Sequence, residues 1–208
     1  MRVILAALAA LVGYLLGSVP TAVLVSRAAG AADPRTVGTR NAGATNVALS
    51  LGLGAGAVVF AADYAKGLVA VVAGSALGGP WVAAGAAAGA ILGQVFPVFG
   101  SFRGGKGLAT TFGGYSALSP GLAAAGVALW AFAAFVLVRR LVAATVVALA
   151  LLAVLAAALA GRLGAPTAAF GAAAFAIGAW AHRRELAAWR RGELPTWRQS
   201  LRDNRERR

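Results

Sequence analysis

Long runs of small and apolar residues, separated by short polar connections, extend along the whole chain. The runs lie near residues 3–25, 52–77, 81–99, 107–118, 120–138, 141–160 and 165–181. Several approach the ~20 residues with which a helix crosses a bilayer, and Ala and Leu dominate where strands would show alternation. Because only helices and closed barrels satisfy their backbone in lipid, the pattern predicts an all-α integral membrane protein.

The number of spans depends on how residues 107–138 are divided. The sequence Leu118-Ser119-Pro120-Gly121 interrupts this stretch, and proline readily begins a new helix. With a break there, the chain has seven runs, and the odd-numbered connections lie on the same side as the basic tail. These connections contain Arg27, Arg35, Arg40, Arg103, Lys106, Arg139 and Arg140. The other side holds only Arg162 and the N-terminal Arg2. Since cytoplasmic loops are rich in Lys and Arg, we expect about seven transmembrane helices, N-terminus outside and C-terminus cytoplasmic.

The two ends of the chain require separate interpretation. Residues 1–30 resemble a cleaved signal peptide, but the apolar run is longer than a usual h-region, so a retained first helix is expected. Residues 1–182 are then a single polytopic transmembrane domain. Residues 183–208 form a basic cytoplasmic tail that lies partly on the membrane surface, with Trp189 and Trp197 among its arginines.

Composition removes several classes of chemistry. The chain of 208 residues has no cysteine, which excludes disulfides, thiolate metal sites and a cysteine thioester intermediate. It has one histidine, His182, and six scattered acidic residues, so neither a metal site nor a cofactor is expected. The net charge of +13 lies in the connections and the tail, which fits an anionic membrane leaflet better than nucleic acid.

Residues 101–111, SFRGGKGLATT, nearly spell a nucleotide-binding loop. Gly100 to Lys106 fits G-x-x-x-x-G-K, but Gly107 stands where Ser or Thr would hold magnesium, and no strand precedes the loop. The glycines still let backbone N–H groups approach an anion, and Arg103 and Lys106 add positive charge. We therefore predict a phosphate site without a nucleotide; the alternative is a flexible cytoplasmic turn.

Three further features are candidates for polar chemistry. Residues 38–46 contain Thr39, Arg40, Asn41, Thr45 and Asn46 just before a helix, which is more than one cap requires and favours an anion or polyol site. Asp63 and Lys66 lie three apart inside an apolar run, so we expect them to pair, either structurally or at a polar cavity. Gly85, Gly89 and Gly93 have the four-residue spacing that permits close helix contact, a spacing that this composition also produces by chance.

These motifs resemble the bacterial membrane-bound acyl-phosphate:glycerol-3-phosphate acyltransferases. The most specific block is GQVFPVFGSFRGGKGLAT, followed by GxxNAGATN, with GSVPT, DYAKG and His182-Arg183 in the same order. The resemblance implies acyl transfer from acyl phosphate to the sn-1 hydroxyl of glycerol 3-phosphate, giving lysophosphatidic acid and phosphate in phospholipid synthesis. It also implies a multi-pass protein of the bacterial inner (plasma) membrane whose site faces the cytoplasm.

Carried onto this chain, the resemblance assigns catalytic roles to Thr39, Lys106 and His182, the last as base or phosphate donor. Substrate and phosphate binding would involve Arg40, Asn41, Thr45, Asn46, Arg103, Gly104, Gly105, Gly107 and Arg183. The chain departs from the family at four places: Thr39-Arg40 replaces Ser-Gly, Leu49 replaces Arg, Gln94 replaces His and Glu185 replaces Asn. A transporter or flippase of a phosphorylated molecule, and a degenerate family member acting as a scaffold, are the alternatives.

Overall fold

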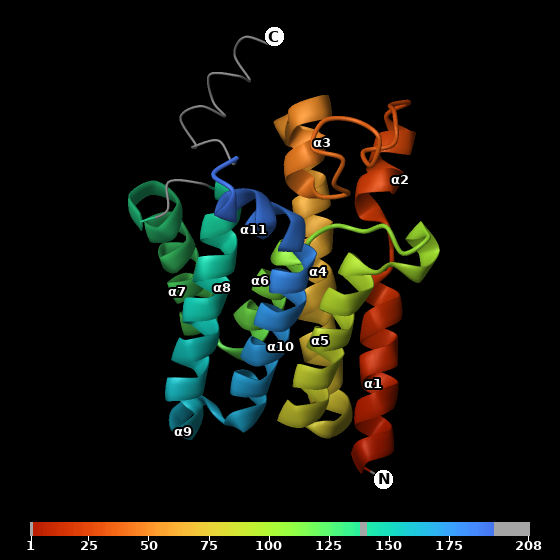
Figure 1. Ribbon diagram of the computed structural model, residues 1–208. Coiled ribbons are helices and arrows are strands. Elements are labelled where there is room, and N and C mark those ends of the chain that lie inside the picture. Colours follow the sequence, from red (N-terminus) through yellow and green to blue (C-terminus); the bar gives the residue numbers. More distant parts are fainter. Residues whose placement is uncertain (1, 138–140, 194–208) are drawn as a thin grey trace.

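The computed structural model describes residues 2–137 and 141–193, and within these ranges all regular structure is helical (Figure 1). The elements are α1 (Arg2–Gly17), α2 (Thr21–Ala28), α3 (Ala44–Leu51), α4 (Leu53–Gly78), α5 (Pro80–Val95), η1 (Val98–Gly100), α6 (Leu108–Leu118), α7 (Pro120–Phe132), η2 (Ala133–Leu137), α8 (Leu141–Ala158), α9 (Ala160–Leu163), α10 (Ala165–Ala181) and α11 (Arg183–Arg190). The prediction of an all-α membrane protein is confirmed.

Helix breaks occur where the sequence supplies them. Proline begins α7 at Pro120, as predicted, and the hydroxyl of Ser119 accepts a hydrogen bond from the Leu122 N–H. The first apolar run is interrupted as well, since residues 18–20 divide it into α1 and α2. Pro20 lacks an N–H and restricts the residue before it, which accounts for the break.

Three helical segments in the described part are long and apolar enough to cross a membrane, namely Ile4–Ala28, Leu53–Gly78 and Pro80–Gly100. Shorter apolar helices are Pro120–Val136, Ala143–Ala158 and Ala165–Ala181. Helix α6 has 11 residues, about 16 Å, against a hydrocarbon core of about 30 Å. The count of seven spans and the orientation of the termini stay predictions; Arg139, Arg140 and residues 194–208 lie outside the described residues.

The helices form a bundle whose two ends differ (Figure 1). Helices α1, α4 and α5 pack together, α6 packs on α4, and α10 lies between α5 and α8. Helices α2, α3 and α11 gather at the end where the polar connections lie, whereas α9, which carries Arg162, is at the opposite end (Figure 1). The two polar segments predicted to meet therefore occupy one end of the molecule.

Close contact between α1 and α5 depends on glycine. A Cβ atom at Gly89 would lie 2.1 Å from the Ala10 carbonyl oxygen, and one at Gly93 would lie 2.0 Å from that of Tyr14. At Gly85 the nearest atom is 3.7 Å away, which is ordinary contact. The four-residue spacing thus marks a real helix contact at two of its three positions.

We predict that Gly89→Ala and Gly93→Ala each destabilise the fold, whereas Gly85→Ala does not. The added methyl group meets rigid backbone at the first two positions, and overpacking of this kind costs about 1–3 kcal/mol. Thermal unfolding of the detergent-purified variants measures the effect. Equal midpoints for all three variants would contradict the contact.

Candidate active site

A buried ion pair lies below the polar end of the bundle. Lys66 Nζ is 2.7 Å from Asp63 Oδ1, one helical turn away on α4, and both side chains are 5% exposed. Gln94 of α5 completes the pair, because Lys66 Nζ donates to its Oε1 at 2.6 Å and its Nε2 donates to Asp63 Oδ2 at 2.9 Å. The predicted pairing of the two charges is confirmed, and the carboxylate and the amide oxygen together neutralise and solvate the ammonium group.

The same pair binds three further parts of the chain. Lys66 Nζ donates to the Val19 carbonyl oxygen at 2.6 Å, at the break between α1 and α2. The hydroxyl of Thr21, in the first turn of α2, donates to Asp63 Oδ1, and Thr110 Oγ1 of α6 donates to the Asp63 carbonyl oxygen at 3.0 Å. Four helices and one helix break are therefore fixed relative to one another by hydrogen bonds to two residues.

Gln94 also connects this network to the glycine segment, residues 100–107. Its carbonyl oxygen accepts the Gly105 N–H at 3.0 Å. A Cβ atom at Gly104 would lie 2.1 Å from that oxygen, and one at Gly105 would lie 2.7 Å from the Ala42 carbonyl oxygen. Glycine is required here because the backbone of the segment passes directly between α5 and the first connection.

A small pocket lies at this crossing point. It is lined by Val19, Pro20, Thr21, Ala42, Gln94, Pro97, Arg103, Gly104 and Gly105. These residues come from the helix break, the first connection, α5 and the glycine segment. The pocket therefore places the buried network, a cation and glycine backbone at one position.

Arg35 and Asp33, which the sequence analysis missed as site-forming residues, hold the two connections together. Arg35 donates to both carboxylate oxygens of Asp33 and, through Nη1, to the Gly100 carbonyl oxygen at 2.8 Å. The hydrogen bond to Arg35 holds the pKa of Asp33 below its ordinary value. The Asp-Pro-Arg sequence indicates a local ion pair in a turn, but it gives no sign of Gly100, the partner of Arg35 that lies 65 residues away.

Asn46 shapes the first connection from behind. Its Nδ2 donates to the carbonyl oxygens of Pro34 and Val37 at 2.6 and 3.1 Å, and its Oδ1 accepts the Thr39 N–H at 2.8 Å. The residue is fully buried. The side chain neither caps α3 nor has a hydrogen atom left for a ligand, so its assignment to direct substrate contact requires another hydrogen-bonding arrangement.

Lys106 and His182 meet at the other flank of the glycine segment. Lys106 Nζ forms an ion pair of 2.6 Å with Glu185 Oε1 in the first turn of α11. His182, between α10 and α11, is buried, and its Nδ1 is 2.8 Å from the Gly178 carbonyl oxygen. Burial and the nearby charge of Lys106 lower the pKa of His182 below its ordinary value. The ring is therefore neutral at pH 7, Nδ1 donates to Gly178, and Nε2 is left as an acceptor.

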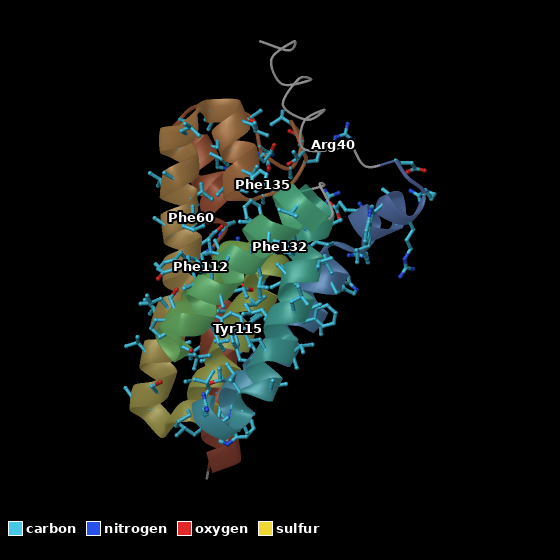
Figure 2. The ribbon with its side chains drawn as sticks, turned by 90° about the vertical axis from the view of Figure 1, so that its left-hand side faces the viewer. Arg40, Phe60, Phe112, Tyr115, Phe132 and Phe135 are labelled. Carbon is cyan, nitrogen blue, oxygen red and sulfur yellow. The ribbon has the colours of Figure 1, made fainter. Side chains whose placement is uncertain are left out.

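The remaining predicted residues lie at the same end of the molecule. Thr39, Arg40 and Thr45 are exposed, Asn41 is half-buried, and Arg40 has a left-handed φ of 55° in the turn (Figure 2). Gly107, with φ 74°, begins α6, and no side chain caps that helix. Arg183 stacks on Trp180 with its guanidinium carbon 3.6 Å from the ring centre. Thr39, Arg40 and Thr45 thus form an exposed rim on the first connection, whereas His182, Gly105 and Gly107 are buried.

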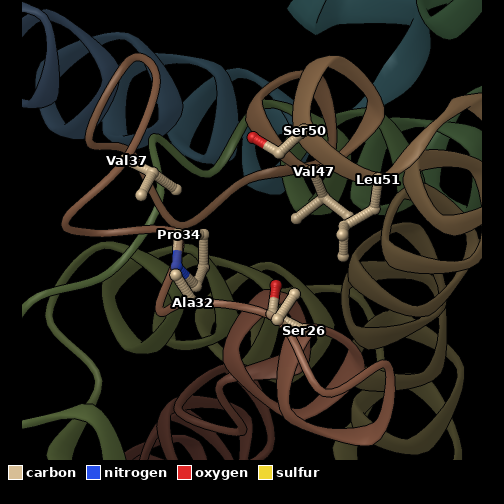
Figure 3. A pocket seen from close by; sticks show the side chains of 8 residues that line it. Ser26, Ala32, Pro34, Val37, Val47, Ser50 and Leu51 are labelled. Atoms are coloured by element: carbon tan, nitrogen blue, oxygen red, sulfur yellow. The ribbon is translucent and has the colours of Figure 1, made fainter.

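A second cavity of about 240 Å³ lies behind the first connection, between α2 and α3 (Figure 3). Apolar residues dominate its lining, among them Pro34, Val37, Val47 and Leu51, and Ser26 and Ser50 add only hydroxyl groups. No cation lines it. The cavity is thus unsuited to a phosphate, whereas the first pocket is lined by Arg103, Gly104 and Gly105 of the predicted site residues.

Apolar helices with a cationic, glycine-rich segment at one end define an integral membrane protein with a positively charged polar site. Residues 7–192 match the glycerol-3-phosphate acyltransferase family, and the chain belongs to that family. A glycerol-3-phosphate acyltransferase of Rubrobacter xylanophilus is 49% identical over 121 residues, which is 58% of this chain and 60% of that relative. One of Thermus thermophilus is 47% identical over 59% of each chain. The matches thus span about three fifths of the length of these relatives.

The fold has counterparts among solved structures. The glycerol 3-phosphate form of PlsY, an integral membrane glycerol 3-phosphate acyltransferase, superposes with a TM-score of 0.82 at 28% identity, over 92% of this chain and 95% of that one. The lysophosphatidic acid form gives a TM-score of 0.80 at 26% identity, over 92% and 94%. The similarity therefore covers nearly the whole chain.

Removal of one partner of the buried pair should be far more damaging than removal of a half-exposed one. We predict that Lys66→Met lowers the free energy of unfolding by about 3–5 kcal/mol, because Asp63 is left buried without its cation. Lys106→Met, which breaks a pair with side chains 24% and 30% exposed, should cost less than about 1 kcal/mol. Unfolding in mixed micelles compares the two variants.

The double variant Asp63→Asn with Lys66→Met serves as the internal control. It removes both charges, so we expect it to be more stable than Lys66→Met alone. A Lys66→Met protein as stable as Lys106→Met would show that the pair does not hold the fold.

Proposed function

We propose that the protein transfers a fatty acyl group from acyl phosphate to the sn-1 hydroxyl of glycerol 3-phosphate, at the cytoplasmic face of the bacterial plasma membrane. The observation that carries this proposal is the meeting of the first connection with the glycine segment beside Lys106 and His182. Both substrates are phosphorylated, and the products would be lysophosphatidic acid and inorganic phosphate. The two PlsY structures are a glycerol 3-phosphate form and a lysophosphatidic acid form, which supports this acceptor and this product.

Phosphate binding is assigned to the glycine segment and its cations. Lys106 supplies a point charge with three donors, and Arg103 lines the pocket beside Gly104. The N-terminus of α6 adds main-chain N–H groups and the positive end of its dipole, with Gly107 as the residue before it. Of the glycine N–H groups, that of Gly105 already donates to Gln94, so Gly105 contributes backbone shape.

The polar rim is assigned to the glycerol moiety and the second phosphate. Thr39, Arg40, Asn41 and Thr45 belong to the first connection, which Asn46 and Arg35 hold in place. Hydroxyl and amide groups suit a polyol, and an arginine suits its phosphate. Arg40 is exposed in this turn, where it offers a cation although Leu49, 45% exposed on α3, provides none.

The chemistry requires position more than a nucleophilic side chain. An acyl phosphate is a mixed anhydride and is already activated, so the glycerol hydroxyl oxygen attacks its carbonyl carbon and the bond from that carbon to the phosphate oxygen breaks. The departing phosphate takes the electron pair, and Lys106 stabilises its charge. The hydroxyl proton goes to Nε2 of His182 or to the departing phosphate itself.

The surrounding membrane supplies the place for the acyl chain. The outer faces of the helices are apolar, with exposed side chains such as Phe60 of α4 and Phe132 and Phe135 near the end of α7 (Figure 2). A fatty chain lying between helices and open to lipid would bring only its phosphate to the polar end. The product would then leave sideways into the bilayer.

We predict that Lys106→Gln lowers kcat/KM by roughly tenfold to hundredfold, because a charge-assisted hydrogen bond to phosphate is worth about 1.5–3 kcal/mol. The assay follows phosphate release and lysophosphatidate formation by purified protein. Arg162→Gln, which removes a cation from the opposite end of the bundle, is the matched control and should retain full activity. Wild-type turnover in Lys106→Gln would remove Lys106 from the site.

The same assay separates the proposal from its rivals. Phosphate and lysophosphatidate released together by the unaltered protein support acyl transfer. Uptake of glycerol 3-phosphate into vesicles without product would instead establish a transporter. If neither lysophosphatidate formation nor uptake is observed, the protein is not an enzyme of this kind, and the scaffold is the remaining alternative.

If Nε2 of His182 accepts the proton, kcat should fall as the pH drops through the pKa of His182, because only the neutral ring is a base. Burial keeps that pKa below the ordinary value of a histidine, so activity should persist at mildly acidic pH. His182→Gln should lower kcat and abolish its fall at low pH. The same fall in the variant would show that the departing phosphate, and not His182, takes the proton.

A further inference from the structure

Glu185 is an acidic side chain placed directly on the lysine of the glycine segment. Its Oε1 accepts from Lys106 Nζ at 2.6 Å, across 79 residues of sequence. The side chains are 24% and 30% exposed, so water and small anions reach the pair. A carboxylate in this position offers Lys106 the same kind of acceptor as a phosphate oxygen does.

The charges around this contact make Glu185 an ionised group. Burial works against its ionisation, but the hydrogen bond and the charge of Lys106 outweigh it, so its pKa lies below the ordinary value. Among the described residues, the charge of His182 also acts on Glu185, and His182 in turn feels the charges of both partners. Arg183, which follows His182, is turned to the Trp180 ring and carbonyl oxygen. Glu185 is therefore the negative charge that a phosphate meets at Lys106.

We propose that Glu185 competes with the substrate phosphate for Lys106 and thereby sets how weakly the enzyme binds that substrate. The inference rests on the proposed function and adds to it a residue that determines substrate affinity. The arriving phosphate displaces the carboxylate, and Glu185 returns to Lys106 when the product leaves. No covalent bond changes in this exchange.

The exposure of the pair makes the exchange feasible. A half-exposed ion pair is worth little, since water screens it and long side chains lose freedom when they form it. A doubly charged phosphate has more charge and more acceptor oxygens than a carboxylate, so at saturating concentration it displaces Glu185 from Lys106. The carboxylate still raises the concentration that is needed, and this effect appears in KM.

The variant Glu185→Gln keeps the shape of the side chain and removes its charge. We expect KM for the phosphate-bearing substrate that Lys106 takes to fall by roughly twofold to fivefold, the range that an exposed pair allows, with kcat within twofold of the unaltered enzyme. Measuring KM separately for acyl phosphate and glycerol 3-phosphate shows which of the two uses Lys106. Glu193→Gln is the control: it removes the same charge from an exposed residue that pairs with Arg191, and KM should not change.

Binding of glycerol 3-phosphate and of inorganic phosphate, measured by calorimetry on the purified protein, provides a readout that needs no turnover. Tighter binding by Glu185→Gln supports the competition even if the protein transfers no acyl group, so the two proposals fail separately. A higher KM or weaker binding in the variant would show that Glu185 orients Lys106 and would overturn the inference. Unchanged values, or equal changes in Glu193→Gln, would overturn it as well.

Discussion

The buried pair of Asp63 and Lys66 is the constraint on which the site depends. Two charges within a bundle of apolar helices are tolerated only if their hydrogen-bonding groups are satisfied, and the partners come from three other helices and one helix break. The chain at Val19 must therefore leave its helix at the level of Lys66. Gln94 must lie opposite both charges, and its carbonyl oxygen then holds Gly105.

The site above the network is assembled from two connections that have little regular structure of their own. Arg35 joins them by its hydrogen bond to the Gly100 carbonyl oxygen, and Gly105 passes close to the Ala42 carbonyl oxygen. The proposed reaction has a donor that is already activated, so it would gain mainly from holding the reactants in place. Rigid support below and cations at the rim suit that requirement better than a reactive side chain would.

Features encoded locally could be predicted from the sequence. The apolar runs became helices, Pro120 began a helix, and Asp63 and Lys66 paired across one turn, because hydropathy and short spacings record such features. The contacts of Arg35 and Lys106 join residues 65 and 79 apart, and only the fold determines them. Asn46 could be recognised as important, but its role in shaping the loop required the positions of its three backbone partners.

The departures from the family pattern acquire physical meaning at the two charged clusters. The network requires of position 94 one acceptor for Lys66 and one donor for Asp63, and the amide of Gln94 supplies both at once. A neutral imidazole offers the same two functions, so glutamine in place of histidine preserves the network while removing an acid–base group that the network does not need. At position 185 the carboxylate is neutralised by Lys106, which belongs to the glycine segment itself. The first departure therefore preserves the network, whereas the second places a negative charge beside the lysine of the proposed phosphate site.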